Sequence, residues 1–122
     1  MIYGPAGYMS TTGASTDPSL LPDDLDVTYP FQEGQTDADW ARTGKHTLSY
    51  AGPYVVTTTE QDEEKETGQV VHGPLTVAHV PAMKGTLQER SYTVVRTPEG
   101  KFLEILQENG GVRGQLWWKA LD

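Results

Sequence analysis

The sequence has 122 residues with nine basic and seventeen acidic side chains, a formal net charge of −8, and no cysteine. This length fits one domain, residues 1 to 122, and the excess of acidic groups would repel phosphate backbones and anionic bilayers, so we expect neither nucleic acid nor a membrane as a partner. Without cysteine there is no disulfide framework and no thiolate metal ligand, which indicates a fold held by packing alone in a reducing compartment.

The chain opens with a predicted hairpin followed by a long loop. Two short β-prone runs, Met1 to Tyr3 and Tyr8 to Thr12, flank a Gly-Pro-Ala-Gly segment whose residues suit a tight reversal. Gly13 to Gly34 is rich in Pro, Asp, Ser and Thr and has few apolar residues to bury. We therefore expect a long acidic surface loop over residues 13 to 34.

A short helix is predicted next. Thr36 suits the N-cap position, and the carboxylates of Asp37 and Asp39 would complement the helix dipole in the first turn. Trp40 would be its apolar anchor, and Gly44 falls in its last turn. We expect this helix to plug or cover one end of a barrel.

The rest of the chain predicts five strands, because its runs are rich in Val, Thr, Tyr, Leu and Trp. Turn-forming residues separate them: an acidic segment at 60–68, a short loop at 81–85, Pro98-Glu99-Gly100 and Asn109-Gly110-Gly111. With the hairpin there are about seven strands, which favours an all-β, antiparallel barrel or strongly curled sheet with room for one ligand. The five predicted strands are Tyr50 to Thr59, Gln69 to Val80, Thr86 to Thr97, Lys101 to Gln107 and Gln115 to Leu121.

Three polar residues are the candidate catalytic set, since neighbouring strands would bring them onto one wall. His72 would act as acid or base, Arg90 as a clamp for an oxyanion or carboxylate, and Tyr92 as a donor to a ligand carbonyl. The alternative is structural: Arg90 packs over a closing Trp while His72 lies at a strand surface.

Aromatic residues on the same strands are candidate ligand contacts. Tyr50, Tyr54 and Trp118 would offer flat surfaces to a planar ligand, and the adjacent Trp117 must face the opposite side of its strand. Glu104 lies between two apolar residues, so it faces either solvent, which its residue type favours, or the ligand.

The sequence lacks the residue patterns that several kinds of chemistry require. No histidine lies at ligand spacing from an acidic residue, and there is no serine-hydrolase elbow, phosphate loop or dinucleotide fingerprint. We therefore expect no metal and no cofactor. The first residues resemble no signal peptide and no window resembles a membrane span, so we expect a cytoplasmic protein.

Four segments of the sequence resemble the lipocalin-like domain family of bacterial and fungal proteins. The longest is His72 to Arg90, which has the family's strand His followed by Pro, Gly and Gln-x-Arg. The others are similar to its early Tyr-turn-Gly-Tyr-Met-Ser hairpin, its Tyr-x-Gly-x-Tyr strand and its closing Leu-x-Trp strand: Ile2 to Ser10, Tyr50 to Tyr54 and Leu116 to Lys119.

The resemblance implies a calycin-type barrel that handles a small hydrophobic or aromatic molecule. Because some fungal relatives belong to natural-product pathways, the first hypothesis is a cofactor-independent isomerase or cyclase of a hydrophobic metabolite. The alternatives are a passive binding or carrier protein with the same pocket, and an interaction module whose interior is filled by side chains.

The sequence departs from the family pattern at two places. The family opens with a Gly-x-Trp strand, whereas this chain begins at what would be the second strand, and Ala120 stands where a basic residue usually follows the closing Trp. A missing strand leaves unpaired backbone groups beside the last strand. We expect a second copy of the chain, the long loop or residues preceding this sequence to complete the wall, and we favour the homodimer or the preceding residues.

Overall fold

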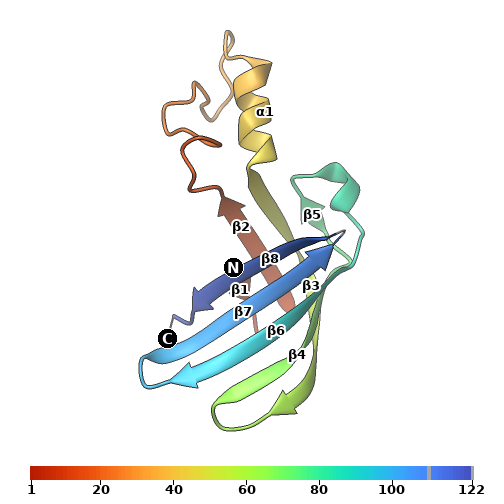
Figure 1. The fold of residues 1–122 in the computed structure, drawn as a ribbon. Coiled ribbons are helices and arrows are strands. Elements are labelled where there is room, and N and C mark those ends of the chain that lie inside the picture. Colours follow the sequence, from red (N-terminus) through yellow and green to blue (C-terminus); the bar gives the residue numbers. More distant parts are fainter. Residues whose placement is uncertain (110, 122) are drawn as a thin grey trace.

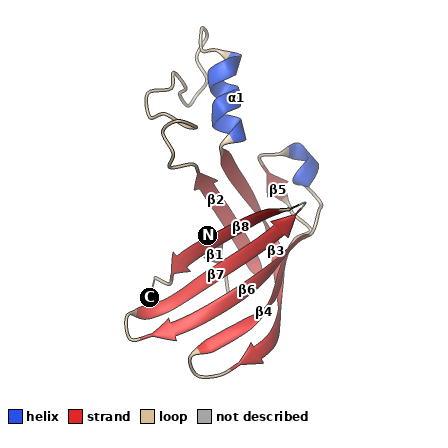
Figure 2. Ribbon diagram, viewed as in Figure 1, coloured by secondary structure: helices blue, strands red, loops and turns tan. Residues whose placement is uncertain are grey.

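A computed structural model describes residues 1–109 and 111–121, apart from the side chains of Asn109 and Val112. These residues form one curled antiparallel sheet from which a helix projects (Figure 1, Figure 2). The strands are β1 (Ile2–Tyr3), β2 (Tyr8–Ala14), β3 (Thr47–Gln61), β4 (Lys65–His72), β5 (Val77–Ala78), β6 (Gln88–Thr97), β7 (Gly100–Asn109) and β8 (Val112–Lys119).

The sheet follows the order of the chain. Its path is β1-β2-β3-β4-β6-β7-β8, with every neighbouring pair antiparallel, while β5 pairs with β3 beside it. This confirms the prediction of an all-β antiparallel fold with about seven strands and one short helix.

The sheet is a half-barrel. Strands β1 and β8 are the two ends of its path, and among the described residues no backbone ladder joins them. Backbone groups of an edge strand are open to further pairing. That a second copy of the chain completes the wall stays a prediction.

One predicted strand is split in two. The segment Gln69 to Val80 forms the end of β4 and then β5, with a break at Gly73 and Pro74. Gly73 has a φ of 127°, which β-strands do not adopt, and Pro74 has no N–H to donate to a ladder. The chain therefore leaves the sheet and returns to pair with an earlier part of β3, where Ala78 faces Tyr50.

The turns are tighter than the sequence suggests. Strands β3 and β4 extend into the predicted acidic turn at 60–68, leaving a short reversal in which the Asp62 carboxylate accepts from the backbone N–H groups of Glu64 and Lys65, both at 2.8 Å. The loop at 81–85 contains a 3-10 turn, Pro81–Met83. Of the predicted Asn109-Gly110-Gly111 turn, Gly110 lies outside the described residues.

The helix α1 (Asp37–Lys45) begins as predicted, because the Thr36 hydroxyl accepts from the backbone N–H of Asp39 at 3.2 Å. The expectation that it plugs or covers one end of the barrel is wrong: none of its residues is buried, and it points away beyond β2 and β3 (Figure 1). Trp40 instead lies near Phe31, with 6.3 Å between the ring centroids, so the helix packs on its own loop. No helix of the described residues is long and apolar enough to span a membrane.

The core lies on the concave face of the sheet in two adjoining clusters. Met9, Tyr50 and Leu75 form the first, and Val70, Tyr92 and Ile105 form the second. Three partly buried side chains, those of Met1, Tyr3 and Tyr54, pack against both clusters. Tyr3 of β1 and Trp118 of β8 both pack against the second cluster, although no backbone ladder joins the two strands among the described residues.

Candidate functional site

The concave face surrounds a cavity of about 690 Å³. Strand alternation decides what lines it: Val94 faces the cavity, whereas the next residue, Val95, does not. The charged lining residues are Glu66, Lys101 and Lys119. The apolar and aromatic lining residues include Met1, Tyr3, Tyr54, Val56, Val70, Tyr92, Val94, Leu103, Ile105 and Trp118.

One wall of this cavity carries a hydrogen-bonded polar cluster around Tyr92. The Tyr92 hydroxyl donates to Oε1 of Glu66 at 2.7 Å and lies 3.1 Å from the Thr58 hydroxyl. Nη2 of Arg96 lies 3.7 Å from the other oxygen of the Glu66 carboxylate. Burial raises the pKa of Tyr92 above its usual value, so the phenol is protonated at neutral pH.

Gly68 makes this cluster geometrically feasible. It lies directly opposite Tyr92 in the β4–β6 register, and the phenol ring crosses over it. A Cβ atom there would come within 2.8 Å of a Tyr92 ring carbon and collide with the backbone oxygen of Thr57. Only glycine lets the Tyr92 ring lie flat enough to reach Glu66 and Thr58.

A second polar cluster is centred on His72, whose side chain is 1% exposed. The Tyr3 hydroxyl lies 2.6 Å from Nε2 of His72, and the Tyr50 hydroxyl lies 3.0 Å from Nδ1. Because a neutral imidazole has one N–H and one lone pair, one tyrosine donates to the ring and the other accepts from it. Strands β1, β3 and β4 supply one residue each.

The pKa values of this cluster favour its uncharged state. Burial, and to a smaller extent the charge of the nearby Arg90 guanidinium, lower the pKa of His72 from 6.5 to about 4. Burial raises the pKa values of Tyr3 and Tyr50, while Arg90 opposes the rise at both phenols. At neutral pH the imidazole is therefore neutral and both hydroxyls are protonated.

The His72 cluster borders a small pocket of about 70 Å³ next to the main cavity. Arg90, Tyr50 and Gln107 also line it, and Met1, Ile105 and Trp118 line both spaces. The Arg90 guanidinium donates to the backbone oxygen of Glu89 at 2.7 Å and to the side-chain oxygen of Gln88 at 3.2 Å.

The predicted catalytic residues fall into these two clusters. His72, Arg90 and Tyr92 share the concave face, as the register places Arg90 opposite Val70 and Tyr92 opposite Gly68. Only His72 and Arg90 line the small pocket, whereas Tyr92 belongs to the wall of the main cavity. The three residues do not form one constellation.

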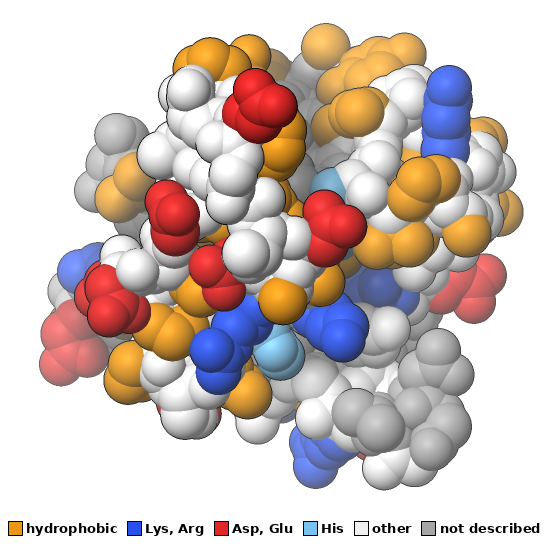
Figure 3. Space-filling view, turned by 90° about the horizontal axis from the view of Figure 1, so that it is seen from above, with side chains coloured by type: hydrophobic (Ala, Val, Ile, Leu, Met, Phe, Trp, Pro, Cys, Tyr) orange, Lys and Arg blue, Asp and Glu red, His pale blue; other side chains and the backbone are white. Residues whose placement is uncertain are grey.

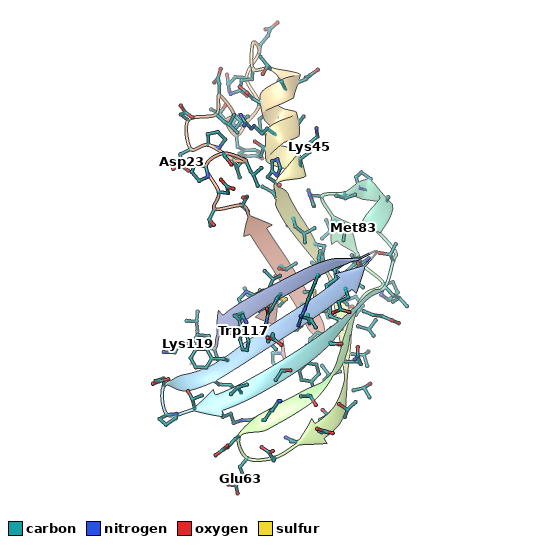
Figure 4. All side chains as sticks on the ribbon, viewed as in Figure 1. Asp23, Lys45, Glu63, Met83, Trp117 and Lys119 are labelled. Atoms are coloured by element: carbon teal, nitrogen blue, oxygen red, sulfur yellow. The ribbon has the colours of Figure 1, made fainter. Side chains whose placement is uncertain are left out.

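The predicted ligand contacts lie on both faces of the sheet. Tyr54 and Trp118 line the main cavity, and Tyr50 and Trp118 line the small pocket. Glu104 lies on the convex face, where it accepts from the Gln115 amide. The neighbouring Trp117 is 54% exposed, and Figure 4 labels it on β8. Alternation along β8 separates the two tryptophans, as expected from their adjacency.

Tyr3, Glu66 and Gly68 are among the site residues that the sequence patterns do not identify. Tyr3 falls in a run too short to predict which face it takes, and Glu66 lies in a segment that composition assigns to an acidic turn. Gly68 ends that predicted turn, although a glycine bordering a β-rich run is also a signal of close packing within a strand.

The site offers few ligands for a metal ion. Among residues 1–109 and 111–121, no three His, Asp or Glu side chains gather in a way that would hold one. Seen from the helix end, acidic side chains are spread among apolar ones, with a few basic groups between them (Figure 3). The arrangement instead offers an apolar space with hydrogen-bonding groups at two points of its wall.

Comparison with known proteins agrees with this geometry. Residues 1–121 match the model of a family described as a lipocalin-like domain, so the chain belongs to that family. No curated protein matches, and no solved structure matches. Family and cavity together support a small-molecule-binding β-barrel.

Proposed function

We propose that this member of the lipocalin-like domain family binds one small, largely apolar organic molecule in the cavity lined by Tyr92, Trp118 and their neighbours. The observation that carries the proposal is the cavity itself, about 690 Å³ and lined mainly by apolar and aromatic side chains. Ligand pockets typically measure roughly 300–1,000 Å³ and have few polar groups, which fix the orientation of the ligand. The Tyr92–Glu66 pair would supply such a polar anchor.

Binding is tested with the neutral fluorescent probe N-phenyl-1-naphthylamine, whose emission rises in an apolar site. Val94→Trp places an indole in the cavity, and we expect it to weaken probe binding at least ~10-fold. The matched control is Val95→Trp, the same change one residue along β6 on the other face, which should leave the affinity unchanged. Equal affinities for both variants, or no binding by the wild-type chain, would contradict the proposal and favour an interaction module.

A second candidate is a cofactor-independent isomerase or cyclase of a hydrophobic metabolite. The observation that favours it is the carboxylate–phenol pair on the cavity wall, with 2.7 Å between the Tyr92 hydroxyl and Glu66. A carboxylate and a phenol side by side are suited to remove a proton from a bound molecule and return it elsewhere. His72 is less suited to this, because both of its ring nitrogens are hydrogen-bonded to tyrosines.

The two candidates differ in what happens to a retained ligand. An isomerase working by proton transfer, incubated in deuterium oxide with a metabolite extract, should return products of unchanged skeleton that carry deuterium. Glu66→Gln should abolish the deuterium uptake while probe binding persists. Retention without deuterium uptake in the wild type would support a carrier instead.

A further inference from the structure

Arg90 is a cation on the concave face of an acidic chain. The structure gives it hydrogen bonds to the Glu89 backbone and the Gln88 amide, which occupy two of the five N–H donors of a guanidinium. Within the part of the chain that the structure describes, the ion pairs are Arg96–Glu66 and Arg113–Glu108, and neither includes Arg90. A partly buried, inward-facing guanidinium with free N–H donors and no carboxylate partner is available to bind an anion.

The small pocket beside Arg90 has the size for such an anionic group. It measures about 70 Å³ and is lined by Arg90, Tyr50 and Gln107, all with polar groups. A single water needs about 10–15 Å³ of such volume, so this pocket accommodates a carboxylate. Because Met1, Ile105 and Trp118 line both spaces, the small pocket adjoins the main cavity, and one end of a molecule in the cavity would have to pass these side chains to enter it.

The His72 cluster orients a second donor toward the same pocket. If Nδ1 of His72 carries the proton, Tyr3 donates to Nε2, Nδ1 donates to the Tyr50 oxygen, and the Tyr50 O–H remains free to donate to a ligand. An anion accepting from Tyr50 and Arg90 would stabilise this arrangement over the reverse one. His72 is then a positioning residue that acts through Tyr50.

We propose that the ligand is an amphipathic organic acid, with its apolar body in the main cavity and its carboxylate bound by Arg90 and Tyr50 in the small pocket. This inference rests on the proposed binding function and names its ligand class. The net charge of −8 does not attract anions at long range, so the preference arises from the local contacts at Arg90.

The test compares decanoate with 1-decanol as competitors of N-phenyl-1-naphthylamine at pH 7. Decanol is the less hydrated of the two, so an apolar pocket alone favours it. We expect the wild type to favour decanoate by at least ~10-fold. Arg90→Met should weaken decanoate binding at least ~10-fold relative to decanol binding, so that the preference for decanoate is lost.

Arg113→Met is the matched control, because it removes the same charge from the exposed outer face of β8. It should leave the preference for decanoate unchanged. A wild type that binds the probe but favours decanol, or an Arg90→Met variant that keeps the wild-type preference, would overturn the inference while leaving the binding function intact. Failure of the wild type to bind the probe would contradict both the inference and the proposed binding function.

Discussion

The curled sheet and the projecting segment, residues 15–46, are stabilised in different ways. The sheet buries Val70, Tyr92 and Ile105 against one another and fixes their register by backbone ladders. In the projecting segment, which the structure describes completely, no residue is buried. Contacts within the segment hold it together, such as the hydrogen bonds from Arg42 to the backbone oxygens of Ser19 and Leu20.

This difference shows where the sequence is constrained. A position facing the cavity must satisfy its neighbours on adjacent strands, so glycine is needed beneath Tyr92 and the His72 ring is enclosed by two phenols. A position in the projecting segment makes its contacts within that segment, as Arg42 does with Ser19 and Leu20, and none of its residues is buried. Substitutions in the sheet should therefore affect global stability far more than substitutions in the segment.

The largest loss of stability is expected from Gly68→Ala. The new Cβ would collide with the Thr57 backbone oxygen and crowd the Tyr92 ring, and such overpacking costs about 3 kcal/mol in the free energy of unfolding. Urea denaturation measures the loss. Gly13→Ala on β2, where a Cβ meets nothing within 4 Å, is the control and should change stability by less than about 1 kcal/mol. Similar losses for both would contradict the close packing at Gly68.

A smaller loss of stability, confined to acidic pH, is expected from protonation of His72. The pKa of His72 is about 4 in the folded chain and about 6.5 in the unfolded chain, so below pH 6.5 the unfolded state binds the proton first. Its contribution to stability is therefore complete above pH 6.5, declines as the pH falls toward 4, and stops changing below that. We expect about 2 kcal/mol over this window, allowing for the polar hydroxyls around the ring.

Urea titrations between pH 7 and pH 4 measure this dependence, and His72→Gln should flatten it. His79→Gln, which changes an exposed histidine, should retain the wild-type slope. An identical slope in all three proteins would mean that carboxylates alone cause the acid sensitivity.

The smallest global effect is expected from Thr36→Ala in the projecting segment. Loss of the N-cap weakens α1 by about 1 kcal/mol, but the free energy of global unfolding should change by less than about 0.5 kcal/mol. Hydrogen exchange should show faster exchange of the α1 amides only, and Thr16→Ala in the loop should change neither quantity. A global loss as large as that of Gly68→Ala would show that the segment is not energetically separate from the sheet.

The sequence by itself determined the kind of fold and most of the turns and caps that bound its strands and helix. Runs rich in β-branched and aromatic residues, the Pro98-Glu99-Gly100 turn and the Thr36 cap depend on interactions between near neighbours, so they can be predicted without a structure. The family resemblance, carried by the same local segments, is confirmed over residues 1–121.

Only the tertiary structure decided how the site is arranged. Which parity of each strand faces inward, and which strands bring Tyr3 and Tyr50 to His72, depend on pairings between residues up to 69 positions apart. The same pairings divide His72, Arg90 and Tyr92 between two pockets and place Glu104 on the outer face. Such contacts arise from the register and curl of the whole sheet, which no local pattern encodes.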